Sequence, residues 1–328
     1  MTTKEKVLRL LDERMEQWVS GEELAEKLEV SRTAVWKQIA ALQKDGYTIL
    51  SETGKGYRLQ PGEVLSAYEI EKRLTTRVIG RPVVYFDSVN STNLYAKNTP
   101  SLSDGTMVVT SHQTAGVGRL ARRLYSPVRA GVYLSILLRP ETVAVADIST
   151  ITLMTAVAVA DTVEELSGVR PQTKWTNDIY LNRRKLCGIL TEASIEGESG
   201  MIRNIIVGIG INLFQRHEDF EPEIRDIAGS VFSETGIRIH PADYAARLAA
   251  NFERYYLDGH FPANKASFLQ KYREGLFFLG ETVEVRSVKG NYFAVAEDID
   301  EDGNLIVRRE DGSRAALNSG EISLKLQR

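Results

Sequence analysis

The first 60 residues contain three short helical patterns followed by a hairpin pattern, and this succession constrains the fold more than any other feature of the sequence. Apolar residues at helical spacing give the first helix one inward face, made of Val7, Leu8, Leu10, Leu11 and Met15. Ser20-Gly-Glu-Glu23 is a capping box and predicts a second helix that turns Leu24, Ala25 and Leu28 inward.

A third helix and a hairpin complete this segment. Ser31 is a good N-cap for a helix that would end at Gly46. Its inward residues would be Ala34, Val35, Ile39 and Leu42. The strand-like stretches 47–50 and 56–59 then flank a turn around Gly54. We therefore predict a winged helix-turn-helix domain over residues 1–62, with Pro61-Gly-Glu63 forming a short linker.

The charge distribution of this segment favours DNA as its partner. Residues 31–60 hold five lysines and arginines against two acidic residues, whereas residues 1–30 hold five against eight. The positive surplus therefore falls on the third helix and the wing, which meet the groove and the phosphates in this motif. The candidate DNA-binding residues are Ser31, Arg32, Thr33, Trp36, Lys37, Lys55 and Arg58. A winged helix that binds protein is the alternative.

The composition is that of an ordinary soluble protein of two or three domains, with 328 residues, 43% of them hydrophobic and 26% charged. A single cysteine, Cys187, excludes an intramolecular disulfide and fits a reducing compartment. The four histidines have no metal-ligand spacing, so we expect no metal-binding residues. We find no apolar run of membrane-span length and no signal-peptide core, which predicts a cytoplasmic protein without a membrane partner.

Two further domains are expected after the linker. Residues 63–275 mix helices and strands, with buried-strand patterns at 83–86, 107–110, 132–138 and 205–211 and long helices at 147–165 and 242–257. Residues 276–328 instead carry short β segments, with hairpin signals at Asp302-Gly303 and Asp311-Gly312. The predicted fold class is α+β: a winged helix-turn-helix, a central mixed α/β domain and a C-terminal SH3-like β-barrel.

A loop rich in glycine and arginine, Gln113-Thr-Ala-Gly-Val-Gly-Arg-Leu-Ala-Arg-Arg123, follows the strand at 107–110. Glycines let the backbone approach a ligand, and arginines can neutralise phosphate oxygens. No Gly-Lys-Ser/Thr follows, which excludes a P-loop. The dinucleotide pattern is formally satisfied but disfavoured, because arginines would crowd the helix face that must meet a sheet. The alternative is a flexible surface loop whose arginines are solvated and bind no ligand.

Three other stretches carry polar groups that can converge on a ligand. Asp178 of Lys174-Trp-Thr-Asn-Asp178 and Lys185 of Arg184-Lys-Leu-Cys-Gly-Ile189 are expected on paired strands. The lysine would be placed to hold a carboxylate or an α-phosphate, and the alternative is a plain surface salt bridge. The hydroxyls and amides of Asp87-Ser-Val-Asn-Ser-Thr-Asn93 either cap a helix or line a pocket for a small polar group.

Together these motifs make the chain resemble the biotin protein ligases that double as biotin operon repressors. The resemblance spans essentially the whole chain and also includes Gly208-Ile-Gly-Ile-Asn212 and Gly320-Glu-Ile-Ser-Leu324. It implies a class-II-synthetase-like catalytic domain that uses ATP and Mg²⁺ to form biotinyl-5′-AMP. The biotin would pass to a lysine of the biotin carboxyl carrier protein of a biotin-dependent carboxylase. With biotinyl-5′-AMP as corepressor, a homodimer promoted by ligand and DNA would bind operator DNA and repress biotin genes.

The resemblance also implies roles for single residues. The catalytic residues would be Lys185, Arg119 and Asp178. The biotin-binding residues would be Ser91, Thr92, Asn93, Gln113, Gly116, Val117, Gly118, Arg119 and Lys185. The residues that bind ATP or the adenylate would be Arg119, Arg122, Leu124, Lys174, Asn177 and Asn212.

Two positions in the glycine- and arginine-rich loop depart from the family's pattern. Val117 stands where an arginine is usual, and Leu124 stands where relatives have a tryptophan that stacks on adenine. Lys325 replaces an arginine of some relatives, a milder change. A biotin-responsive repressor with weak or lost ligase activity is therefore the alternative. A lipoate-type ligase is disfavoured by the arginine-rich loop and by a pocket suited to a urea.

Overall fold

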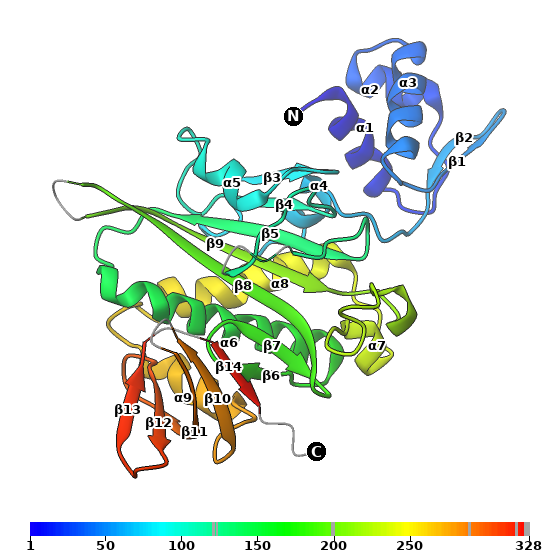
Figure 1. Cartoon of the computed structure of the whole chain (residues 1–328). Coiled ribbons are helices and arrows are strands. Elements are labelled where there is room, and N and C mark those ends of the chain that lie inside the picture. The colour runs from blue at the N-terminus through cyan, green and yellow to red at the C-terminus, as the bar shows by residue number, and fades with distance from the viewer. Residues whose placement is uncertain (120–121, 123, 198–200, 288–289, 319–320, 325–328) are drawn as a thin grey trace. The chain divides into compact units, whose positions relative to one another are not determined.

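The computed structural model of the chain describes residues 1–119, 122, 124–197, 201–287, 290–318 and 321–324 (Figure 1). The chain forms two compact units, Met1–Glu69 and Ile70–Arg328. Hydrogen bonds extend the first unit beyond the predicted linker. The hydroxyl groups of Tyr47 and Ser66 lie 2.8 Å apart, and the Tyr68 hydroxyl donates to Asp12 at 2.9 Å.

The first unit is the predicted winged helix. Its elements are α1 (Thr3–Asp12), α2 (Gly21–Leu28), α3 (Arg32–Lys44), β1 (Ile49–Glu52) and β2 (Gly56–Leu59). The Ser31 hydroxyl caps α3 by accepting from the Ala34 N–H at 3.1 Å. Ser20 likewise accepts from the Glu23 N–H at 3.0 Å. The Glu23 carboxylate, however, pairs with Arg14 and Lys27, so the predicted capping box is realised on its serine side.

The wing hairpin depends on Gly56. This glycine has a φ of +100°, and a Cβ on it would lie 2.2 Å from the Val19 carbonyl oxygen. The close approach lets Val19 and Tyr57 exchange two backbone hydrogen bonds, at 2.9 and 2.8 Å. The wing is thereby fixed to the residue that precedes α2.

A seven-stranded sheet forms the centre of the second unit, in the order β3-β4-β5-β9-β8-β7-β6. The strands are β3 (Val83–Phe86), β4 (Met107–Thr110), β5 (Gly131–Leu138), β6 (Gln172–Lys174), β7 (Asp178–Leu181), β8 (Arg184–Ile195) and β9 (Ile202–Asn212). β3 and β4 run parallel, and every other neighbouring pair is antiparallel. The four predicted buried strands correspond to β3, β4, β5 and β9, so these predictions are confirmed.

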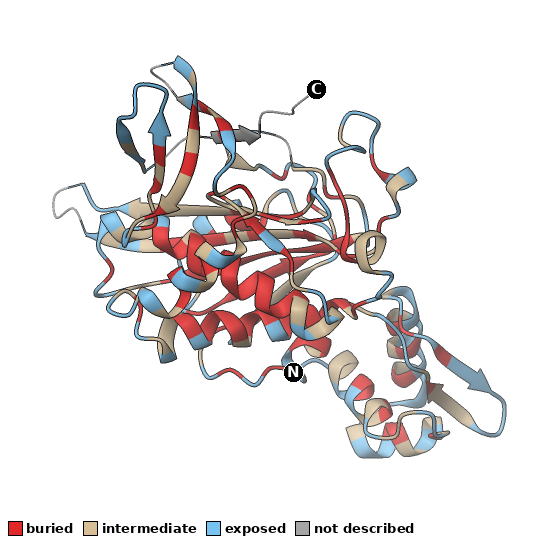
Figure 2. Ribbon diagram, turned by 90° about the horizontal axis from the view of Figure 1, so that it is seen from below, coloured by how far each residue is buried: buried red, intermediate tan, exposed pale blue. Residues whose placement is uncertain are grey.

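Long helices cover one face of this sheet (Figures 1 and 2). They are α6 (Ile148–Ser167), α8 (Pro241–Glu253), which continues as a π-helical turn (Arg254–Asp258), and α9 (Ala266–Gly275). By length and composition alone Val145–Ser167 would pass as a membrane span, which the sequence analysis did not anticipate. Of the 18 most apolar consecutive residues in this stretch, 67% are buried inside the protein. It is therefore a core helix.

Shorter helical segments connect these elements. They are α4 (Ala67–Glu71), α5 (Thr92–Lys97), η2 (Val145–Asp147), η3 (His217–Asp219) and α7 (Val231–Thr235). The segment from η3 to α7 follows the end of β9 and packs beside the start of β8. The Lys185 N–H donates to the Ile227 carbonyl at 2.8 Å, and the Gly229 N–H donates to the Lys185 carbonyl at 3.0 Å.

The C-terminal strands form a separate antiparallel sheet in the order β13-β12-β11-β10-β14. Its strands are β10 (Thr282–Ser287), β11 (Gly290–Ile299), β12 (Leu305–Arg309), β13 (Arg314–Leu317) and β14 (Glu321–Leu324). Gly303 and Gly312 take positive φ in the two predicted hairpin turns. The Trp175 indole N–H donates to the Gly303 carbonyl at 3.0 Å, which joins this sheet to the central one. The α+β prediction with a small C-terminal β domain is confirmed.

Candidate functional site

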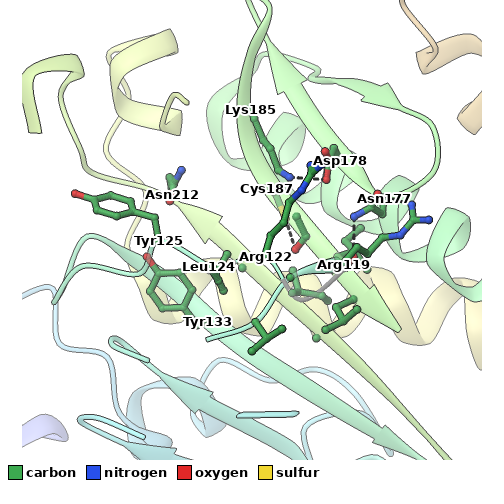
Figure 3. A pocket seen from close by; sticks show the side chains of 18 of the residues that line it. Arg119, Arg122, Leu124, Tyr125, Tyr133, Asn177, Asp178, Lys185, Cys187 and Asn212 are labelled. Carbon is green, nitrogen blue, oxygen red and sulfur yellow. Dashed lines mark hydrogen bonds and ion pairs between the residues drawn. The ribbon is translucent and has the colours of Figure 1, made fainter. Parts of the chain in front are cut away.

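A cavity of about 330 Å³ opens among β7, β8, β9 and the glycine- and arginine-rich loop (Figure 3). It brings together nearly all the predicted site residues of the second unit. From the biotin set it is lined by Ser91, Thr92, Asn93, Gln113, Val117, Gly118, Arg119 and Lys185. From the adenylate set it is lined by Arg119, Arg122, Leu124, Lys174, Asn177 and Asn212, and Asp178 also faces it. Gly116 is outside the lining but packs against it, because a Cβ there would lie 3.1 Å from Gln113 Nε2.

One side of the cavity holds Arg119. Its guanidinium donates through one nitrogen to the Thr176 hydroxyl. The same nitrogen donates to the Asn177 Oδ1 at 3.0 Å; Figure 3 labels Arg119 and Asn177. Asn177 is fixed in turn, since its Nδ2 donates to the Ile189 carbonyl at 3.0 Å. The Tyr272 hydroxyl donates to the Thr176 carbonyl at 3.0 Å. The turn between β6 and β7 therefore anchors the loop and orients its cation.

Lys185 and Asp178 face the cavity as an ion pair, with Lys185 Nζ 2.7 Å from Asp178 Oδ1. The two side chains are 40% and 20% exposed, so the ammonium is open to a ligand while the carboxylate lies behind it. A β-bulge between Ile179 and Tyr180 shifts the strand register here, a device that commonly re-aims side chains near functional sites. A Cβ on Gly188 would lie 3.4 Å from the Lys185 Nζ, and the glycine leaves that space open.

The polar end of the cavity is a hydrogen-bonded network. The Thr92 N–H donates to Gln113 Oε1 at 2.8 Å, and the Ser135 hydroxyl donates to Asn93 Oδ1 at 2.6 Å. The Asn93 Nδ2 donates to Glu192 Oε2 at 2.7 Å. This end of the cavity thus presents both donors and acceptors, which a urea requires. Ser91 differs from its neighbours, because its hydroxyl accepts from the Leu94 N–H at 3.3 Å as the cap of α5.

Gly208 makes the position of Asn93 possible. A Cβ at this glycine would lie 2.3 Å from Asn93 Oδ1, closer than non-bonded atoms can approach. The sequence analysis quoted Gly208 as part of a motif but gave it no role. Ser135 and Glu192 were also missed. Ser135 is a polar residue within an otherwise apolar strand, and that interruption of the pattern is the signal that could have identified it. Glu192 lies among other polar residues of β8 and carries no such signal.

Figure 3 shows Leu124, Tyr125 and Tyr133 close together in the cavity lining, with the polar side chain of Asn212 beside them. The sequence analysis did not identify the two tyrosines. The Tyr125 hydroxyl donates to the Asp219 carbonyl at 2.9 Å, which joins the loop to the segment around η3. Tyr133 is only 1% exposed, and burial raises the pKa of its phenol well above the usual value. It is a neutral, largely apolar wall.

Cys187 also lines the cavity but is not suited to nucleophilic chemistry. Burial raises the pKa of its thiol far above the ordinary range, so the thiolate is not populated near neutral pH. Among the described residues no group of three or more His, Cys, Asp or Glu side chains could hold a metal ion. Leu120, Ala121, Arg123, Gly320 and Lys325 lie outside the described residues.

A second candidate surface lies on the winged helix. Arg32, Thr33, Trp36 and Lys37 are exposed on α3, while Ser31 caps that helix. On the wing, Lys55 pairs with Glu52 at 2.7 Å. The Arg58 guanidinium lies 4.9 Å from the centre of the Trp18 ring, and the Lys55 ammonium lies 5.8 Å from it. Trp18, which the sequence analysis missed, thus orients the wing cations through cation–π contacts.

Comparison with known proteins agrees with this arrangement. Residues 3–58 match an HTH domain, residues 85–212 the biotin/lipoate A/B protein ligase family, and residues 278–325 the biotin protein ligase C terminal domain. The bifunctional ligase/repressor BirA of Bacillus subtilis (strain 168) is 35% identical over 98% of this chain and 99% of that protein. BirA of Escherichia coli (strain K12) is 31% identical over 93% of this chain and 92% of that protein.

Among solved structures, the biotin protein ligase from Aquifex aeolicus in complex with biotin and ATP superposes with a TM-score of 0.63 at 28% identity. The match covers 75% of this chain and 99% of that chain.

Proposed function

Since this chain belongs to the family of bifunctional biotin protein ligases and biotin operon repressors, we propose that it activates biotin with ATP to biotinyl-5′-AMP and transfers the biotin to a carrier protein. The acceptor would be a lysine of the biotin carboxyl carrier protein of a biotin-dependent carboxylase. The same chain would repress biotin genes. In enzyme terms it is a biotin–[biotin carboxyl-carrier protein] ligase.

One observation carries the ligase proposal. Arg119 and Lys185 line the same cavity, and a network of hydrogen-bond donors and acceptors lines it as well. Activation requires the biotin carboxylate to attack the α-phosphorus of ATP, forming a C–O–P bond while pyrophosphate leaves. Two anions must approach each other, and charge builds on the phosphate oxygens. Fixed cations at that point stabilise the transition state more than the separated reactants.

We assign complementary roles to these two cations. Thr176 and Asn177 hold Arg119, and a guanidinium oriented in this way would bind phosphate oxygens. Lys185 would bridge the biotin carboxylate and the α-phosphate. Its backbone is fixed by hydrogen bonds to Ile227 and Gly229, and Asp178 holds its ammonium until ligand arrives.

The polar network would hold the ureido ring of biotin. Thr92, Asn93 and Gln113 are each buried, and an unmatched polar group there would cost about 1–3 kcal/mol. A ligand without the urea is rejected for that reason. The glycine- and arginine-rich loop would cover the adenylate and keep water from the mixed anhydride until the acceptor lysine arrives.

We infer that Mg²⁺ would enter with the phosphates of ATP, because the described residues contain no cluster of acidic or histidine ligands for it. Asp178, the acidic residue of the cavity lining, would be the carboxylate that contacts the hydrated ion. We also infer a cytoplasmic location, which suits the reduced Cys187.

For the repressor activity we propose that α3 and the wing contact operator DNA through Arg32, Thr33, Trp36, Lys37, Lys55 and Arg58, with Ser31 at the helix start. One helix-turn-helix reads a half-site, so we propose a homodimer promoted by ligand and DNA. Footprinting should protect two half-sites related by a two-fold axis, and protection of a single half-site would contradict the dimer.

A second candidate function is a biotin-responsive repressor with weak ligase activity, favoured by Val117 and Leu124. Val117 is 49% exposed and offers no charge to a phosphate. Biotin-dependent exchange between ATP and pyrophosphate distinguishes the two functions. Exchange supports the ligase, whereas biotin binding without exchange supports the repressor alone. Exchange with lipoate in place of biotin would instead indicate a lipoate-type ligase.

A further inference from the structure

Trp36 projects from the middle of α3 into solvent, and its side chain is 59% exposed. The opposite face of the helix supplies the core, where Val35, Ile39 and Leu42 are 0–2% exposed. Trp36 therefore contributes little to the folded unit. A single exposed apolar side chain is common on protein surfaces, but the residues around Trp36 set it apart.

The surroundings of Trp36 are cationic and polar. Arg32 and Thr33 lie one turn before it on the same face, Lys37 adjoins it, and the small Ala40 lies one turn after. In the part of the chain that the structure describes, neither Arg32 nor Lys37 is paired with a carboxylate, whereas Lys55 is paired with Glu52. Free cations flanking an exposed helix face complement a phosphate backbone on either side of a groove.

A helix in the major groove meets base edges that are almost entirely hydrogen-bond donors and acceptors. The exception is the 5-methyl group of thymine, the apolar feature that B-DNA presents there. An indole has one N–H donor and a large apolar surface, so the apolar surface has thymine methyl groups as its partner. We propose that Trp36 packs on a thymine methyl group in each half-site and makes that position thymine-selective. This inference rests on the proposed DNA contact of α3 and the wing.

The test removes the methyl group from the DNA and the indole from the protein. A duplex is first selected from random-sequence DNA by the full chain in the presence of biotin and ATP. Each thymine is then replaced singly by deoxyuridine, which lacks only the methyl group. We expect at least one thymine per half-site at which this replacement weakens binding by about fourfold, the effect of burying one methyl group. In Trp36→Ala the thymine duplex should bind roughly tenfold more weakly, and deoxyuridine should have no further effect.

Lys37→Ala is the matched control at the adjacent exposed position of α3. It should weaken the thymine and deoxyuridine duplexes by the same factor and lower the salt dependence by about one counterion. The inference would be overturned if Trp36→Ala and deoxyuridine together reduced the affinity for DNA by the product of their separate effects. A wild-type protein that is indifferent to every deoxyuridine would also overturn it.

Two further outcomes separate this inference from the proposal beneath it. If the wild-type chain selects no duplex, the proposed DNA surface fails, and the role of Trp36 fails with it. If Trp36→Ala changes the oligomeric state but not the affinity for DNA, the indole serves a protein contact, and the thymine assignment is wrong while DNA binding stands. Circular dichroism checks that the variant is folded.

Discussion

The hydroxyl of Thr176 is the contact in this site whose removal tests the mechanism most sharply. It accepts from the Arg119 guanidinium, while the neighbouring Asn177 Oδ1 accepts from the same nitrogen at 3.0 Å. Thr176→Val keeps the shape of the side chain but removes the acceptor. A hydrogen bond to a charged group contributes about 1.5–3 kcal/mol. Arg119 and Thr176 are both half-buried, so the lower figure of about 1.5 kcal/mol applies. That free energy corresponds to roughly a tenfold change in an equilibrium or rate.

We expect Thr176→Val to release biotinyl-5′-AMP about tenfold faster than wild type, because the loop that covers the intermediate loses the hydroxyl that accepts from Arg119. Stopped-flow measurement of adenylate release gives the rate directly. Trypsin should also cleave the loop at its arginines more readily in the variant. Affinity for biotin alone should change little, because Thr92, Asn93 and Gln113 lie at the other end of the cavity and keep their hydrogen bonds.

Thr176→Ser is the matched control, since it retains the hydroxyl and should retain slow release. A release rate in Thr176→Val within twofold of wild type, with an unchanged melting temperature, would refute the reasoning. The loop would then be held by contacts other than the Arg119 anchor.

Three further predictions test the remaining parts of the proposal. Lys185→Ala should reduce adenylate formation more than a hundredfold, consistent with about 3 kcal/mol of lost transition-state stabilisation, with an unchanged circular dichroism spectrum; formation within a fewfold of wild type would contradict its assignment. Removal of residues 1–69 should abolish DNA binding in a gel-shift assay yet leave ATP–pyrophosphate exchange, because residues 70–328 form their own compact unit; DNA binding by the truncated chain would contradict the role of the winged helix. Val117→Arg with Leu124→Trp should slow adenylate release about tenfold, since base stacking contributes about 1–3 kcal/mol; an unchanged rate would show that other residues retain the intermediate.

Much of the fold was predictable from the sequence because it follows from local patterns. The apolar run at 205–211 in β9 is uninterrupted, that of β5 is broken only by Ser135, and the capped helices of the first unit carry their own start signals. The strands β6 and β13 were not predicted. β6 has three residues, all of them polar, and β13 has four residues that begin with an arginine. Pairing with their neighbours, rather than their own sequence, makes them strands.

The candidate site was predictable where its residues cluster in motifs and was missed where the tertiary fold brings in single residues. Arg119, Asp178 and Lys185 belong to motifs and do meet at one cavity. Ser135 on β5 and Glu192 on β8 lie outside these motifs, and they reach the site because those strands flank β9. Thr176 lies within a quoted motif but received no role there, and only the position of Arg119 gives its hydroxyl one.

The positions that depart from the family's pattern have a structural consequence when the loop is considered as a whole. Compared with the family's pattern, Val117 lacks the charge, and Leu124 lacks the aromatic ring, that would contact the bound nucleotide. The loop is nevertheless tied to both walls of the cavity, through Arg119 to the β6–β7 turn and through the Tyr125 hydroxyl to Asp219 at 2.9 Å. A loop already ordered by such contacts loses less conformational entropy when ligand binds than one that must fold over it. Retention of the adenylate should therefore depend more on hydrogen bonds within the protein, between the loop and the cavity walls, than on stacking against adenine. For this reason we expect substitution of Thr176 to have a large effect on the rate of release.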